Sequence, residues 1–164
     1  MLLHEHLENK LDKQPDFLFS EFQGRQITYR EANTLSNKLA HSLISAGLKK
    51  GDRFAFLSKN SSEMAFMYYA ASKVGVVPVP LNYRLADKEW EYIVNDSQSK
   101  IMIIRGNEYC ERIKTSRDNY KHIQMCKTHT HKSILIMNFK KNRLIINTKN
   151  NNNKHIITYL NKNT

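Results

Sequence analysis

The chain has 164 residues, enough for one ordinary domain, and its formal net charge is +11 at pH 7. Residues 1–118 hold 17 Lys and Arg and all 15 Asp and Glu, whereas residues 119–164 hold nine Lys and Arg and no acid, so the basic charge belongs to the tail. Two cysteines are too few for a disulfide scaffold. The chain has no apolar run of membrane-spanning length and no secretory signal, which argues against a transmembrane or an exported protein. We therefore predict a cytoplasmic protein.

The first predicted elements are a hairpin and a helix. Apolar and polar residues alternate on both sides of Gly24 over residues 17–29, which predicts a β-hairpin. Thr28 and Glu31 form the T-x-x-E pattern of a helix capping box, and apolar residues then follow at helical spacing. Gly47 is placed to end this helix in the left-handed conformation.

Strands and helices alternate along the next part of the chain. Residues 53–57 and 101–104 are short apolar runs typical of buried strands. Helices are predicted over residues 61–74 and from Asp87 onward. Between them lies GVVPVPLN, residues 75–82, in which a glycine ends a helix and two prolines impose extended backbone. The order predicts an α/β fold, with a layered parallel sheet and flanking helices.

The composition changes sharply near Asp118. From residue 119 to 164 there is no Ala, Gly, Val, Asp or Glu, which are the five amino acids whose codons begin with G. This pattern is typical of translated A/T-rich non-coding or out-of-frame DNA, and the alternative is a genuine low-complexity basic extension. We therefore predict two segments, an ordered one over residues 1–118 and a disordered or non-native tail over residues 119–164.

Phosphate-binding loops need several glycines close together, because backbone amides must approach the anion. The five glycines of this chain lie at least four positions apart, so neither a P-loop nor a dinucleotide-binding fingerprint is present. Gly75 is interpreted as a helix C-cap and not as part of a ligand loop.

Residue types that bind zinc occur late in the chain: Cys110, His122, Cys126, His129 and His131. They lack a second spaced pair, so no metal site is predicted. His4 and His6 are interpreted as solvent-exposed residues near the N-terminus.

Catalytic arrangements are also missing from the helical segments. Glu89 and Glu91 are two positions apart and would point to different faces of a helix, so they are interpreted as solvated residues and not as a catalytic pair. Ser61 and Ser62 lack the G-x-S-x-G motif of a nucleophile and are explained by capping of a helix that starts at Asn60. No catalytic, cofactor-binding or metal residue is therefore predicted.

The basic tail could bind nucleic acid without sequence preference. Its Lys and Arg would contact phosphates, and Phe139 and Tyr159 could stack on bases. No known nucleic-acid-binding motif organises these residues, so no specific nucleic-acid partner is expected.

Several short motifs recur in a fixed order between about residues 15 and 115. Ile27 to Glu31 read as an apolar residue followed by T-Y-x-E, and Ser72 to Asn82 contain K-x-G-x-x-x-x-P-x-N. In order and spacing these motifs resemble the N-terminal part of the AMP-forming acyl-CoA synthetases, in the adenylate-forming ligase superfamily. Trp90 stands where leucine is usual, and Ala86 precedes a helix that threonine commonly caps; neither departure alters the expected fold.

The resemblance implies part of the N-terminal domain of a ligase that uses ATP, Mg²⁺ and CoA to convert a fatty or other carboxylic acid into an acyl-CoA. The family's catalytic residues lie in a Ser/Thr/Gly-rich phosphate loop, a Y-G-x-T-E motif, a T-G-D motif and a C-terminal lysine, and none of these motifs occurs in this sequence. We therefore expect an N-terminal fragment that is inactive alone and binds no cofactor. A pseudoenzyme, a docking subunit of a split ligase and, less favoured, a nucleic-acid-binding protein remain alternatives.

Overall fold

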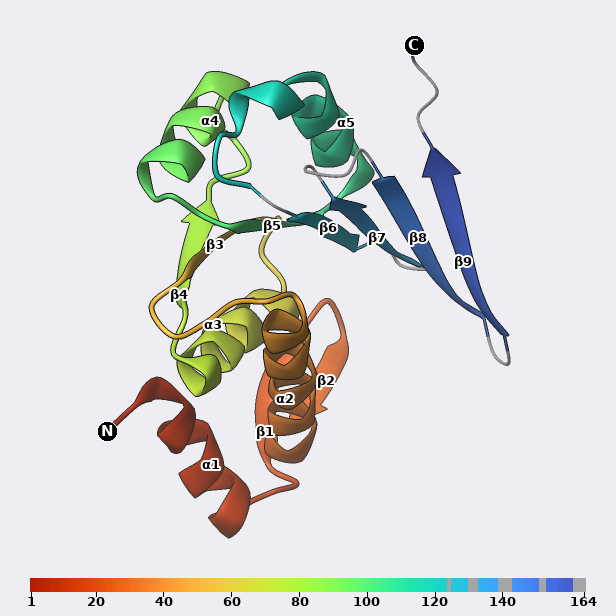
Figure 1. Cartoon of the computed structure of the whole chain (residues 1–164). Helices are drawn as coiled ribbons and strands as arrows, with labels where there is room; N and C mark the ends of the chain where they lie inside the picture. Colours follow the sequence, from red (N-terminus) through yellow and green to blue (C-terminus); the bar gives the residue numbers. More distant parts are fainter. Residues whose placement is uncertain (124, 130–132, 139–142, 151–152, 161–164) are drawn as a thin grey trace. The chain divides into compact units, whose positions relative to one another are not determined.

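The computed structural model describes residues 1–164 except 124, 130–132, 139–142, 151–152 and 161–164 (Figure 1). The chain forms two compact units, one of Met1–Asp52 with Asn60–Pro78 and one of Arg53–Lys59 with Val79–Thr164. In the part of the chain that the structure describes, no helix has the length and apolar character needed to cross a membrane.

The first unit combines helices with a β-hairpin. Its elements are α1 (Leu3–Lys13), β1 (Leu18–Phe22), β2 (Arg25–Thr28), α2 (Tyr29–Ser45) and α3 (Ser62–Val74). The hairpin turns at Gln23 and Gly24, which both have positive φ (52° and 75°), as a two-residue type I′ turn requires. Thr28 Oγ1 accepts from the Glu31 amide at 3.2 Å, and the Glu31 carboxylate accepts from the Thr28 amide at 2.9 Å. The predicted hairpin and capping box are therefore confirmed.

The core of the first unit is aromatic. The Phe19 ring packs against Tyr29, Phe66 and Tyr69, with ring centroids 5.4, 6.0 and 5.8 Å apart. Burial raises the pKa of the Tyr69 hydroxyl, and Tyr29 raises it further. α1 joins this core through Leu7, the buried residue of that helix. A single buried leucine gives too weak a periodic signal to predict a helix, which is why the sequence did not reveal α1.

The second unit is a sheet with helices. Its elements are β3 (Arg53–Leu57), β4 (Val77–Leu81), α4 (Asp87–Asp96), β5 (Ile101–Arg105), α5 (Asn107–Thr115), the 3-10 turn η1 (Arg117–Asn119), β6 (Met125–His129), β7 (Ser133–Asn138), β8 (Arg143–Asn150) and β9 (Asn153–Leu160). The strand order is β4-β3-β5-β6-β7-β8-β9, and β3, β5 and β6 run parallel. Helices α4 and α5 pack on the sheet through a shared core (Figure 1). The predicted parallel sheet with flanking helices is confirmed.

The residues just after the composition change belong to this core. Tyr120 and Ile123 are each only 4% exposed and pack with α4, α5 and the parallel strands. The close packing of the second unit therefore continues past the boundary predicted at Asp118.

Beyond that point the chain contains β6 to β9, which pair in an antiparallel series within residues 125–160. Repeated Ile and Thr in these segments favour extended backbone, and this preference opposes the low-complexity signal of the composition. The disorder of the tail stays a prediction.

Candidate functional site

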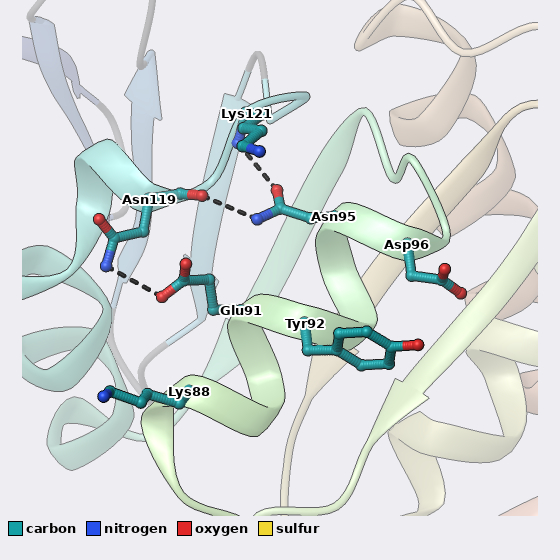
Figure 2. Close-up of a pocket in the computed structure, with 7 residues that line it drawn as sticks. All are labelled: Lys88, Glu91, Tyr92, Asn95, Asp96, Asn119 and Lys121. Atoms are coloured by element: carbon teal, nitrogen blue, oxygen red, sulfur yellow. Dashed lines mark hydrogen bonds between the residues drawn. The ribbon is translucent and has the colours of Figure 1, made fainter.

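A hollow of about 540 Å³ lies on the outer side of α4, beside the chain that follows η1 (Figure 2). It is lined by Lys88, Glu91, Tyr92, Asn95, Asp96, Asn119 and Lys121. Substrate pockets are mostly apolar, with a few polar groups that orient the ligand. Here nearly every lining side chain is charged or an amide, and the Tyr92 side chain is largely exposed. The lining is therefore typical of a solvated surface.

The hydrogen bonds in this hollow hold the chain to itself. Asn95 Nδ2 donates to the Asn119 carbonyl at 2.8 Å, and Asn95 Oδ1 accepts from the Lys121 amide at 2.9 Å. Asn119 Nδ2 donates to Glu91 Oε2 at 2.9 Å (Figure 2). The Asn95 side chain thus provides hydrogen-bond partners for two backbone groups, one at the end of η1 and one just after it. This arrangement fixes the segment after η1 on α4 and places Tyr120 in the core.

The two predicted surface carboxylates have separate structural roles. Glu89 accepts from the Ala86 amide at 2.8 Å and so caps the start of α4, whereas Glu91 binds Asn119. That they do not form a catalytic pair stays a prediction.

The inner face of α4 is organised around Trp90. This side chain is fully buried, and its Nε1 donates to the Asn82 carbonyl at 2.8 Å. The Arg112 guanidinium lies over the ring, 3.9 Å from its centroid, and its Nε donates to Asp87 Oδ1 at 2.6 Å. Each polar group here has a partner within the chain, which is typical of a structural cluster.

Many α/β sheets bind ligands at the carboxyl ends of the two neighbouring strands between which the crossover connections change direction. In this sheet those strands are β3 and β5. In this chain Lys59 Nζ lies 3.5 Å from Glu108 Oε1 at that edge. The other Glu108 oxygen is 2.9 Å from the position that a Cβ on Gly106 would occupy. A carboxylate of the chain therefore lies close to the Gly106 backbone.

The segment GVVPVPLN is a helix stop followed by an edge strand. Gly75 adopts the left-handed conformation (φ 76°) at the end of α3, and its amide donates to the Ala71 carbonyl at 2.8 Å. β4 follows as the outermost strand of the sheet and contains Pro78 and Pro80. Proline lacks an amide proton and is tolerated on such an edge. The predicted C-cap and extended segment are confirmed.

A buried charge in the first unit was not predicted from the sequence. The Lys73 side chain is 12% exposed, forms an ion pair with Glu8 and donates to Asn33 Oδ1 at 3.0 Å. These contacts join α1, α2 and α3, so Lys73 is satisfied inside the fold and is not presented to a ligand. The only sequence signal was its place in the K-x-G motif of residues 73–75.

The predicted exposure is correct for His6 and wrong for His4. His6 is exposed, whereas His4 is half-buried, with its Nδ1 2.9 Å from Ser72 Oγ. The reason is that α1 packs against α3, a contact that could not be foreseen without predicting α1.

Of the late cysteines and histidines, Cys110 and His122 differ in burial. Cys110 is buried in the core of the second unit, and His122 is exposed. Cys126 and His129 lie on β6, and His131 is outside the described residues. Among the residues that the structure describes, no three His, Cys, Asp or Glu side chains are grouped so that they could hold a metal ion.

The start of α3 differs in detail from the prediction. Ser61 and not Asn60 occupies the N-cap position, and its hydroxyl makes no capping hydrogen bond. Ser62 is the first helical residue and is 8% exposed. The prediction that helix capping explains Ser61 and Ser62 is therefore wrong for their hydroxyls. The Ser61 hydroxyl is buried and has no hydrogen-bond partner in the described structure.

Of the two aromatic residues considered for base stacking, the structure describes one. Phe139 is outside the described residues, and Tyr159 lies on β9, opposite Leu144. A nucleic-acid surface therefore stays a hypothesis from charge alone.

A model of the AMP-binding enzymes matches residues 7–159. The long-chain-fatty-acid–CoA ligase FadD13 of Mycobacterium tuberculosis is 45% identical over 78 residues, which are 48% of this chain and 16% of FadD13. The crotonobetaine/carnitine–CoA ligase of Proteus mirabilis is 32% identical over 105 residues, 63% of this chain and 20% of that ligase.

Solved structures show the same fold. The inhibitor-bound N-terminal domain of FACL13 from M. tuberculosis superimposes with a TM-score of 0.72 at 30% identity, covering 78% of this chain and 33% of that domain. Coronafacic acid ligase from Pectobacterium brasiliense has a TM-score of 0.73 at 23% identity, covering 79% of this chain and 26% of that ligase. The chain thus spans about a fifth or less of the curated relatives and about a third or less of these structures.

Proposed function

Because the chain belongs to the AMP-binding enzyme family, whose model matches residues 7–159, we propose that it supplies the N-terminal part of an AMP-forming acyl-CoA ligase and is catalytically inactive alone. The observation that carries this proposal is the coverage: identity to FadD13 reaches 45%, yet the match takes in 16% of its length. A complete ligase of this kind would join a fatty or other carboxylic acid to CoA and convert ATP to AMP and pyrophosphate, with Mg²⁺ assisting. We place this chemistry in the cytoplasm.

The described residues do not fit ATP. The glycines are too widely spaced for a phosphate loop, and the Glu108 carboxylate lies close to Gly106, where its negative charge disfavours a phosphate. Two of the less exposed basic side chains are paired with carboxylates of the chain, Lys73 with Glu8 and Arg112 with Asp87. These observations support a role in folding and assembly, and we assign no catalytic step to this chain.

A second candidate function is a docking subunit that completes a ligase from a separate polypeptide. It is favoured by large apolar side chains that the first unit leaves exposed, among them Phe17 and Leu18. A complete ligase would have further chain available to cover them, since the matched part is a minority of each relative.

We expect the purified chain to show no saturable binding of Mg·ATP at millimolar concentrations, because no loop offers clustered backbone amides to a triphosphate. Isothermal titration calorimetry measures this, with FadD13 of M. tuberculosis titrated in parallel as the positive control. Saturable binding with a micromolar dissociation constant would contradict the proposal.

A further inference from the structure

The β1–β2 hairpin is a two-stranded sheet, so each strand has one free edge. A hairpin is marginally stable unless one face is packed or a further strand is added. Its inner face is packed, since Phe19 and Ile27 contribute to the aromatic core of the first unit. The remaining apolar side chains of this region are partly exposed: Phe17 is 63%, Leu18 48% and Phe22 37% exposed.

The register identifies which backbone groups of β1 are free. Phe22 is opposite Arg25 across the two-residue turn, and Glu21 is opposite Gln26. The two residues that flank such a turn hydrogen-bond to each other through both their amides and their carbonyls. In the next pair, the amides and carbonyls point away from the partner strand. We therefore expect the amide and carbonyl of Glu21 to face away from β2.

The sequence of β1 lacks the residues that usually block strand addition. Free edges are commonly blocked by proline, by lysine or by a covering element. β4, the edge of the other sheet, carries two prolines, whereas β1 has the sequence LFSEF, with neither proline nor lysine. Its one charged side chain, Glu21, accepts a hydrogen bond from Gln26 at 2.9 Å and is thereby drawn toward β2.

We infer that the free edge of β1 binds a β-strand of the complementary part of the ligase, with Phe17, Leu18 and Phe22 packing against that partner. The inference rests on the proposed function, because the partner is the portion of the ligase fold that this chain does not span. The coverage supports this choice, because more than half of the FACL13 N-terminal domain has no counterpart here. Strand addition would pair the outward backbone groups and cover the apolar side chains together.

The test co-expresses the full chain with FadD13 of M. tuberculosis from which the 78-residue matching segment has been deleted. We expect the two polypeptides to co-elute. Glu21→Pro removes the outward amide and should weaken the complex at least about tenfold, whereas Glu21→Ala keeps that amide and should bind within about twofold of the wild type.

A second pair of variants does not depend on how well the hairpin tolerates proline. Leu18→Lys places a charge on the exposed edge and should also weaken the complex about tenfold, whereas Ile44→Lys makes the same change at a 54% exposed position on α2 and should have no effect. Hydrogen exchange of the wild-type chain gives an independent measurement, in which the Glu21 amide should exchange more slowly in the complex.

The outcomes separate this inference from the proposed docking function. If the wild-type chain co-elutes with the truncated ligase, and Glu21→Pro and Leu18→Lys bind equally well, the β1 edge is not the docking surface although docking stands. If the wild-type chain does not co-elute, docking is wrong and the inference is overturned with it. Self-association of the chain alone that is lost in Glu21→Pro would assign the edge to a second copy and would also overturn the inference.

Discussion

Replacing Trp90 with alanine should destabilise the second unit by about 3–5 kcal/mol, the usual cost of removing a fully buried aromatic side chain. The ring is 0% exposed, and its removal leaves a cavity under α4 and an unpaired Asn82 carbonyl. The Arg112 guanidinium also loses the ring over which it lies. Urea unfolding followed by circular dichroism measures the loss, because Trp90 is the only tryptophan and the variant cannot be followed by its fluorescence.

Two variants on the same helix serve as controls. Tyr92→Ala removes an aromatic side chain that is 68% exposed and should change the free energy of unfolding by less than about 0.5 kcal/mol. Trp90→Phe keeps most of the ring volume and should fall between Trp90→Ala and the wild type. If Trp90→Ala and Tyr92→Ala were equally stable, the core described around α4 would be wrong.

Ending the chain after Asp118 should destabilise the second unit by about 3–5 kcal/mol relative to a chain that ends after Ile123. The five residues between these ends include Tyr120 and Ile123, both 4% exposed, and the two backbone groups bound by Asn95. Differential scanning calorimetry of the two truncated chains and the full chain measures the effect.

The same three chains test the predicted disorder of the tail. If residues 124–164 are disordered, the chain that ends after Ile123 should be as stable as the full chain, within about 0.5 kcal/mol. A larger loss on removing residues 124–164 would instead mean that β6 to β9 contribute to the fold. Equal stability of the chains that end after Asp118 and Ile123 would contradict the packing described for Tyr120.

Elements with a local physical signal could be predicted from the sequence. Thr28 and Glu31 specify a helix start by themselves, and Gly75 with Pro78 specifies a helix end and an edge strand, because backbone sterics and nearby hydrogen bonds decide these features. The buried runs of β3 and β5 were recognisable because strands covered on both faces are apolar throughout.

The features that were missed depend on contacts between distant residues. α1 buries only Leu7, and the burial of Lys73 follows from α1 and α2 both packing near α3. α5 is a nine-residue helix whose apolar residues are few, so its periodicity is short. The burial of Tyr120 in the core was not predicted, because the composition change near Asp118 placed this residue in the tail and composition carries no information about packing. For the site, the sequence predicted no catalytic residue, and that stays a prediction.

We propose that this chain carries the N-terminal part of a ligase fold and none of its catalytic groups. The exchange of labelled pyrophosphate into ATP, measured with the purified chain, Mg²⁺ and a panel of fatty acids, tests it most directly, because acyl-adenylate formation is the step that requires the missing motifs. The expected result is no acid-dependent exchange above background, beside clear exchange by full-length FadD13. Acid-dependent exchange by this chain alone would contradict the account.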